Sequence, residues 1–123
     1  IIDIMREDQA ALEKLEQIAK TNQVHYITAP SVMELAVGIV LAGLPTQEEK
    51  RVENILKEFQ ILSLDTFSAW RAGLESGRLR NKGITVDPID AQIAGIALEM
   101  RETIVTRNEK HFTCFPDLQV ESY

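Results

Sequence analysis

The chain has 123 residues, of which 45% are hydrophobic and 26% are charged. The length fits one domain, since domains run to roughly 100–200 residues, and the apolar share is too high for a disordered chain. The net charge of −6 argues against nucleic-acid binding through bulk charge alone, but it leaves open a nuclease whose acidic site binds a metal ion. The single cysteine excludes an internal disulfide and a cysteine-based zinc site, and it fits a reducing cytosol.

The sequence also argues against a membrane-spanning protein and against a secreted one. Its longest uninterrupted apolar run covers residues 35–44, about half of the ~20 residues that a bilayer-spanning helix needs. No basic start followed by an apolar stretch predicts a signal peptide. We therefore expect a single cytoplasmic domain over residues 1–123. Residues 1–3 look like the end of a hydrophobic strand, which predicts that the first strand is truncated before Ile1.

The first half of the chain predicts three helices and two strands. Apolar residues at spacings of three and four predict an amphipathic helix over residues 7–21. Residues 24–28 are β-branched and aromatic and predict a short strand, after which residues 30–42 form a helix that is apolar on most sides. Such a helix is buried in the core or at a subunit interface. A capping-box pattern at residues 46–49 starts a helix to residue 59, and residues 61–64 predict a buried strand.

The second half predicts two more helices and two short strands. Asp65 or Thr66 can cap a helix that ends near residue 83, and the helical spacing of Phe67 and Trp70 favours core positions over a base-stacking platform. Asp87 begins a helix to residue 100, and residues 103–106 and 118–120 predict the last strands. Strands alternating with helices indicate a three-layer α/β fold, with a short, mainly parallel central sheet flanked by about five helices.

The expected chemistry lies just beyond the carboxyl ends of the strands, where open α/β sheets bind their ligands. Acidic side chains that converge there are tolerated when they hold a hard cation such as Mg²⁺ or Mn²⁺. A metal ion held by carboxylates can activate water for the hydrolysis of a phosphodiester bond. The candidates at this edge are Glu34, Asp87, Asp90, Thr106, Arg107 and Asn108.

Helix capping explains the same acidic residues without any metal. The stretch from Ser31 to Glu34 has the spacing of a capping box, in which the glutamate reaches back to a backbone N–H. Asp87 can be an N-cap, and Asp90 places a negative charge at the positive end of its helix. Capping and metal binding are compatible at Asp87, so spacing alone leaves both interpretations open.

Several stretches resemble one known family. Residues 90–97 (DAQIAGIA) and 104–112 (IVTRNEKHF) resemble the C-terminal signature of PIN-domain ribonucleases, in particular of the VapC-type toxins of toxin–antitoxin pairs. Residues 28–35 (TAPSVMEL) are similar to the second motif of the family, residues 1–3 to the tail of its first motif, and residues 118–123 to its closing strand. The resemblance covers nearly the whole chain and implies a PIN-like fold.

The resemblance also implies roles for individual residues. Glu34 and Asp90 match the acids that coordinate Mg²⁺ or Mn²⁺, and Thr106 matches a hydroxyl that supports the site. Asn108 falls where relatives have Asn or a fourth acid, so it would contact the metal ion, its water or the substrate. The sequence departs from the family twice: the first catalytic Asp would lie upstream of Ile1, and His111 stands where many relatives have an Asp.

A group of basic residues could contact an RNA backbone, although it also fits an ordinary solvated helix face. Its members are Arg71, Arg78, Arg80, Lys82 and Arg107. Arg107 could instead pair with a carboxylate of the site. We expect His25 and His111 to be structural or partly exposed, and Cys114 to be a small packed residue rather than a nucleophile.

These patterns predict a divalent-metal-dependent endoribonuclease that cleaves single-stranded or structured RNA, as the toxin of a toxin–antitoxin pair. The alternative is a catalytically inactive PIN-like module that binds RNA or acts as a scaffold, which the absent first acid and His111 would favour. A metal-dependent phosphatase is less favoured, because no aspartyl-phosphate motif is present. The apolar helix that includes residues 32–44 predicts a homodimer, and the family implies a cognate antitoxin.

Overall fold

The protein is described from a computed structural model, which covers residues 2–4, 9–21, 23–41, 43 and 46–122. Its elements alternate along the chain as expected. They are β1 (Ile2–Ile4), α1 (Gln9–Ala19), β2 (Tyr26–Thr28), α2 (Ala29–Leu41), α3 (Thr46–Leu56), β3 (Gln60–Leu62), α4 (Thr66–Asn81), α5 (Pro88–Met100), β4 (Ile104–Thr106), the 3₁₀ turn η1 (Glu109–His111) and β5 (Val120–Ser122). Within the described part of the chain, no helix is both long and apolar enough to cross a membrane.

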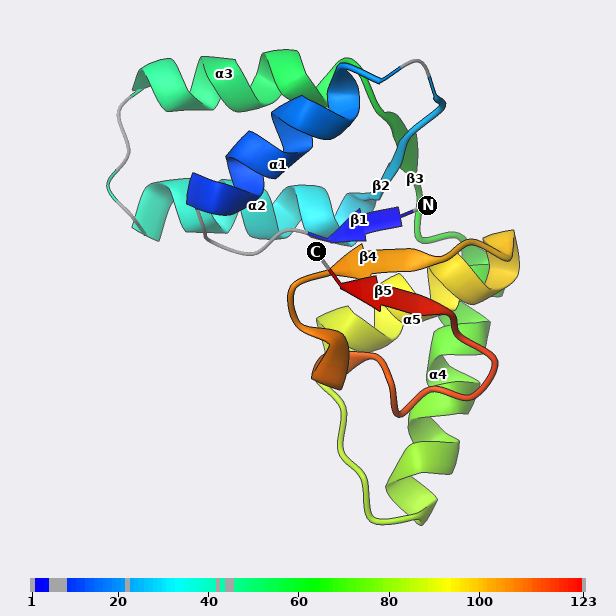
Figure 1. Cartoon of the computed structure of the whole chain (residues 1–123). Helices are drawn as coiled ribbons and strands as arrows, with labels where there is room; N and C mark the ends of the chain where they lie inside the picture. Colours follow the sequence, from blue (N-terminus) through cyan, green and yellow to red (C-terminus); the bar gives the residue numbers. More distant parts are fainter. Residues whose placement is uncertain (1, 5–8, 22, 42, 44–45, 123) are drawn as a thin grey trace.

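The strands form one sheet in the order β3-β2-β1-β4-β5, and every neighbouring pair is parallel. Ile2 in the central strand pairs with Tyr26 on one side and with Ile104 on the other, so the carboxyl ends of these three strands lie at one edge. The helices α1, α2 and α3 gather beside one half of the sheet, and α4 and α5 beside the other half (Figure 1). The predicted α/β fold with a short parallel sheet and five helices is confirmed.

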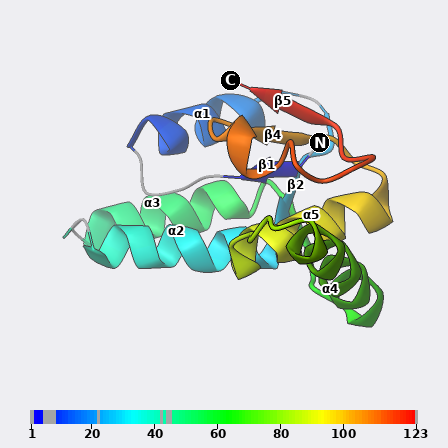
Figure 2. The same ribbon diagram turned by 90° about the horizontal axis from the view of Figure 1, so that it is seen from below.

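Two hydrophobic clusters form the core. One joins α1, β2, α2 and α3 around Leu15, Ile27 and Leu35, and the other joins α5, β4 and the C-terminal segment around Ile93, Ile104 and Phe112. Helices α2 and α5 contact each other and so connect the two halves. Seen from below, α2 and α5 lie in line on one side of the sheet, with α1 on the other (Figure 2).

The strand predicted as buried, residues 61–64, is instead the exposed edge of the sheet. The observed strand β3 covers Gln60–Leu62 and pairs only with β2 among the described strands, and Ile61 is 46% exposed. An apolar run of this length cannot distinguish a central strand from an edge strand, because both carry β-branched residues.

The expectation that Phe67 and Trp70 lie in the core is also wrong, because they are 74% and 71% exposed. The face of α4 that packs inward carries Ser68, Ala72, Glu75 and Leu79. Helix α4 begins with the predicted cap: Asp65 Oδ1 accepts a hydrogen bond from the backbone N–H of Ser68 (2.8 Å), and the Ser68 hydroxyl accepts one from the backbone N–H of Asp65 (2.9 Å). Small inward side chains let α4 approach α5 closely, which leaves the aromatic residues outside.

We predict that Gly95→Ala destabilises the domain at this helix contact. A Cβ at Gly95 would lie 2.5 Å from the carbonyl oxygen of Ser68 and 2.9 Å from the backbone nitrogen of Ala72. Because backbone atoms cannot give way without moving α4, we expect the free energy of unfolding to fall by about 1–3 kcal/mol. Urea unfolding followed by circular dichroism measures the change.

The matched control is Gly73→Ala in α4, where an added Cβ meets nothing within 4 Å. Alanine favours the helix over glycine, so this variant should gain about 0.5–1 kcal/mol. Equal stability of Gly95→Ala and the wild type would contradict the close approach of α4 and α5.

Candidate functional site

The candidate site centres on Asp90, which lies in the first turn of α5 and is 2% exposed. Its Oδ2 atom lies 3.0 Å from Nδ1 of His111, a half-exposed side chain at the end of η1. Because β4 runs parallel to its neighbours and η1 follows it closely, this contact lies at the carboxyl edge of the sheet. The predicted position of Asp90 at this edge therefore agrees with the structure.

Asp87 holds the start of α5, as the capping interpretation predicted. Its Oδ1 atom accepts hydrogen bonds from the backbone N–H groups of Ile89 (2.9 Å) and Asp90 (3.3 Å), and Pro88 is the first helical residue. Proline has no backbone N–H, and the first position of a helix needs none, so Asp87 followed by Pro88 defines where α5 begins. The cap thereby sets the position of Asp90.

Thr106 and Asn108 shape the turn that leads from β4 to η1. Thr106 is buried at the end of β4, and its Oγ1 atom accepts a hydrogen bond from the backbone N–H of Asn108 (3.0 Å). Asn108 itself is exposed at the start of η1. The Thr106 hydroxyl therefore holds the backbone that carries the Asn108 side chain.

Glu34 is not part of a capping box, because α2 begins two residues earlier than Ser31. Thr28 caps the helix: its Oγ1 atom accepts from the backbone N–H of Ser31 (3.2 Å) and lies 2.7 Å from the Ser31 hydroxyl. Glu34 falls in the second turn of α2 and is partly buried. It lies on a helix that contacts α5, the helix of Asp90.

The chemistry of these acidic residues fits a hard divalent cation, since Mg²⁺ and Mn²⁺ prefer carboxylate oxygens. The ligand set is incomplete within the described part of the chain, where no three Asp, Glu, His or Cys side chains gather in a group suited to a metal ion. Glu34 and Asp90, the two acids expected to bind the metal ion, lie on two helices that contact each other.

Two basic residues of α4 pair with an acid of the same helix. Oε1 of the buried Glu75 accepts from Arg71 Nε (3.2 Å) and Arg78 Nη1 (3.1 Å), so one negative charge offsets part of their positive charge. Arg80 is exposed near the end of α4. Arg107 is exposed directly after Thr106, so of the predicted RNA-contacting residues it lies nearest to the candidate site along the chain.

His25 and Cys114 have structural roles, as expected. His25 is nearly buried, and its Nε2 atom lies 2.5 Å from the Thr21 hydroxyl. Burial raises the pKa of the partly buried Cys114 thiol, and the negative charge of Asp90 adds to this shift. A thiol with a raised pKa stays protonated near neutral pH, which argues against a nucleophilic cysteine.

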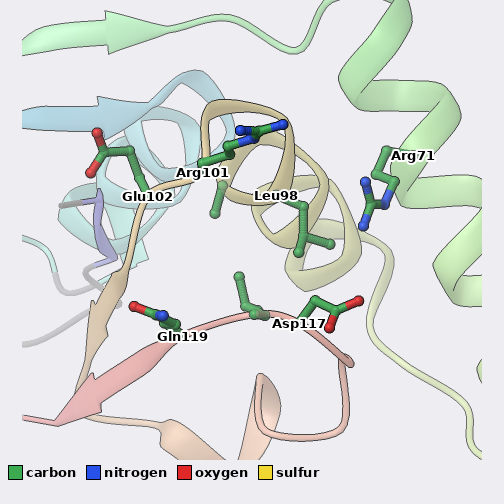
Figure 3. A pocket seen from close by; sticks show the side chains of 8 residues that line it. Arg71, Leu98, Arg101, Glu102, Asp117 and Gln119 are labelled. Atoms are coloured by element: carbon green, nitrogen blue, oxygen red, sulfur yellow. The ribbon is translucent and has the colours of Figure 1, made fainter.

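A cavity of about 290 Å³ lies at the opposite end of α5 from Asp90. Figure 3 shows Arg71 of α4 facing Leu98 and Arg101 at the end of α5, with Asp117 and Gln119 from the segment before β5. Arg71 also lies 3.9 Å from Glu99. Because this cavity adjoins the C-terminal end of α5, it is separate from the site at Asp90.

The contact between Asp90 and His111 is the feature that sequence reasoning missed. The two residues are 21 positions apart, and His111 was expected to be structural or partly exposed. The available signal was its position shortly after a predicted strand, at the edge where Asp90 was also expected. Only the path of η1 brings the imidazole to the carboxylate.

A family model described as "PIN domain" matches residues 1–115. Individual proteins of known name are also similar to this chain in sequence. The "tRNA(fMet)-specific endonuclease VapC" of Salmonella typhimurium (strain LT2) is 30% identical over 97 residues, which cover 79% of this chain and 74% of the relative. The "Ribonuclease VapC2" of Rickettsia felis is 27% identical over 109 residues, covering 89% of this chain and 81% of the relative.

Solved structures show the same fold. One match is a chain of VapBC2 from Rickettsia felis, solved bound to a DNA fragment from its promoter. The TM-score is 0.79 and the sequence identity is 22%, and the match covers 100% of this chain and 99% of the Rickettsia chain. The DNA-bound VapBC of Salmonella typhimurium gives a TM-score of 0.78 at 23% identity, with coverage of 98% and 96%. The chain therefore belongs to the PIN-domain family. Within that family it is a VapC-type protein.

We predict that the cap, rather than a metal bond, is the role of Asp87. Asp87→Ala removes the hydrogen-bond acceptor at the start of α5 and should lower the free energy of unfolding by about 0.5–2 kcal/mol. Asp87→Ser keeps an acceptor oxygen at the N-cap while removing the charge, so it should retain wild-type stability. Urea unfolding measures both variants.

Calorimetric titration with Mn²⁺ distinguishes the two roles. Asp87→Ser should bind the ion as tightly as the wild type. A serine variant that folds normally but loses Mn²⁺ affinity would show that Asp87 is a metal ligand.

Proposed function

We propose that this protein is a divalent-metal-dependent endoribonuclease, acting as the toxin of a toxin–antitoxin pair. The observation that carries the proposal is the buried Asp90 carboxylate at the start of α5, held by His111 at the carboxyl edge of a parallel sheet. A buried carboxylate is costly unless it is paired or binds a cation, and a paired acid at the ligand-binding edge of a parallel sheet supports a functional role. The membership of the PIN-domain family and the names of the VapC relatives support the same activity.

In this mechanism, Glu34 and Asp90 would hold Mg²⁺ or Mn²⁺. The bound ion would supply an activated water and neutralise charge on the phosphate that is attacked. His111 fixes the orientation of Asp90, since one of its carboxylate oxygens is engaged by the imidazole. Thr106 holds the backbone at Asn108, whose exposed side chain would contact the substrate or the metal ion. Arg107, next to it in sequence, is suited to contact a phosphate of the RNA.

A second candidate function is a PIN-like module that binds RNA or acts as a scaffold without cleaving RNA. Two observations favour it: His111 engages one oxygen of Asp90, and the described residues contain no group of three metal ligands. The nuclease and the RNA-binding form of the module both predict RNA binding. Only the first requires the metal ion and the Asp90 carboxylate for turnover.

We also propose that the chain binds a cognate antitoxin and forms a homodimer. Several of the structural neighbours were solved as toxin–antitoxin complexes, including one from Klebsiella pneumoniae. Helix α2 exposes a row of large apolar side chains, namely Met33, Val37, Val40 and Leu41. Beside this row, an apolar groove of about 290 Å³ runs between α2 and α3, with Glu49 and Glu53 among its lining residues. An antitoxin segment with apolar and basic residues fits this groove, on the same helix as Glu34.

The central prediction concerns RNA cleavage. The full-length protein should cleave single-stranded RNA in the presence of Mg²⁺ or Mn²⁺, and EDTA should abolish the cleavage reversibly. Asp90→Asn should reduce the rate by about 100-fold or more, because an amide is a much weaker metal ligand than a carboxylate. Denaturing gel electrophoresis of a labelled RNA measures the rate.

The matched control is Asp117→Asn, which makes the same chemical change beside the cavity at the other end of α5. Asp117 has a φ of 65°, and asparagine adopts this conformation readily. The control should retain full activity. Persistent cleavage in EDTA, or wild-type activity of Asp90→Asn, would reject the mechanism. Metal-independent RNA binding without cleavage would favour the inactive RNA-binding module.

The antitoxin proposal predicts a defect confined to binding. Val40 is 74% exposed, so Val40→Asp should fold normally and cleave RNA at the wild-type rate. A charge on the apolar face should weaken binding of the antitoxin encoded beside the gene by about tenfold or more. Calorimetry with the two purified proteins tests this prediction. Unchanged affinity would place the antitoxin on another surface.

A further inference from the structure

The imidazole of His111 and the carboxylate of Asp90 face each other at the carboxyl edge of the sheet. Nδ1 of His111 lies 3.0 Å from Oδ2 of Asp90. The Asp90 carboxylate is almost completely buried, whereas the His111 side chain is 43% exposed. The imidazole therefore gives this pair a side that is open to solvent.

The separation of these two atoms suits two ligands of one metal ion. Divalent cations bind imidazole nitrogen and carboxylate oxygen at about 2.0–2.2 Å. Two ligand atoms at that distance, about 90° apart around an octahedral ion, lie about 3.0 Å from each other. Nδ1 of His111 and Oδ2 of Asp90 therefore need not move apart to bind the same ion.

The backbone of His111 is held on both sides. Its N–H group donates a hydrogen bond to the carbonyl oxygen of Asn108 (3.0 Å), and its own carbonyl oxygen accepts one from the Cys114 thiol (3.9 Å). The next residue, Phe112, is 1% exposed and belongs to the core cluster of α5 and β4. A side chain on such a fixed backbone is well placed to bind an ion, because little of its supporting structure has to be ordered first.

We propose that His111 is a nitrogen ligand of the divalent cation that Asp90 binds. In this role Nδ1 offers its lone pair to the ion, and the single hydrogen of the neutral ring lies on Nε2. Glu34 and water molecules would supply further oxygen ligands. The inference rests on the proposed metal-dependent function, and it concerns which cation that site prefers.

A nitrogen ligand changes the metal preference of the site. Carboxylate and water oxygens suit Mg²⁺, whereas imidazole favours later transition-metal ions such as Co²⁺ and Ni²⁺. A site with one imidazole should therefore prefer Co²⁺ over Mg²⁺ by a larger factor than the same site with oxygen ligands only. The expectation of Mg²⁺ or Mn²⁺ rests on the acidic residues alone, and His111 adds a donor of a different kind.

A purely structural hydrogen bond is the other role open to His111. In that case any donor in the place of Nδ1 would serve Asp90 equally well. Asparagine provides the comparison, because its amide nitrogen takes the place of Nδ1 and can donate to Asp90, yet this nitrogen has no lone pair to offer a metal ion. His111→Asn therefore keeps the hydrogen bond and removes the nitrogen ligand.

Pulsed EPR spectroscopy with Mn²⁺ tests the bond to nitrogen directly. The full-length protein with one equivalent of Mn²⁺ should show a coupling to ¹⁴N, because the unpaired electrons of the ion reach a directly bound nitrogen. The coupling should disappear in His111→Asn and persist in His25→Gln. The chain has two histidines, and His25 is nearly buried beside Thr21, so these two variants assign the signal.

Calorimetric titration measures the preference between Co²⁺ and Mg²⁺. We expect the dissociation constant for Mg²⁺ divided by that for Co²⁺ to fall by about tenfold or more in His111→Asn. His111→Asp, which places a carboxylate at this position, should lower the same ratio while Mg²⁺ binding is retained. An unchanged ratio in both variants would overturn the proposal, as would a ¹⁴N coupling that persists in His111→Asn.

The same measurements separate this inference from the proposed nuclease activity. Mn²⁺ that binds without a ¹⁴N coupling, in a protein that cleaves RNA, would reject the nitrogen ligand but not the nuclease. A ¹⁴N coupling that depends on His111, in a protein that does not cleave RNA, would support the ligand and reject the nuclease. No binding of Mn²⁺ or Co²⁺ would reject the ligand and the metal-dependent mechanism together.

Discussion

The burial of α5 is the constraint on which the rest of the domain depends. Seven of its side-chain positions are buried, and most of them are small, so α4 approaches on one side while α2 and the sheet lie close by. Gly95 permits the closest approach, because any Cβ there would enter the backbone of α4. A helix held in this way has little freedom to rotate or slide. Its first turn therefore carries Asp90 to a fixed place at the carboxyl edge of the sheet.

The candidate site is distinguished by the contact between the Asp90 carboxylate and the His111 imidazole. A buried carboxylate needs a compensating partner, and the imidazole supplies one from a turn that follows β4. The resemblance to the family implies an Asp at this position in many relatives, where this chain has the imidazole of His111. That exchange lowers the negative charge around Asp90 and fixes one of its oxygens.

Sequence patterns predicted the elements and the start of α5, but not which faces are buried. Asp87 and Pro88 specify a helix start through local hydrogen bonding, which needs no tertiary information. The spacing of Ser31 and Glu34 fits a capping box, yet Thr28 caps the helix earlier and Glu34 falls in the second turn. The spacing of Phe67 and Trp70 placed them correctly on one face. Ser68 and Ala72 on the opposite face are small and pack closely on α5, so the face with Phe67 and Trp70 is exposed to solvent.

The two exposed apolar faces lie on helices with different relations to the candidate site. Helix α2 carries Glu34 and begins directly after β2, so a partner bound along it lies next to the acidic residues. The row from Phe67 to Leu74 belongs to α4, whose aromatic end adjoins the far end of α5. The apolar row on α4 therefore lies at the end of α5 away from Asp90, whereas the exposed face of α2 belongs to the helix that carries Glu34.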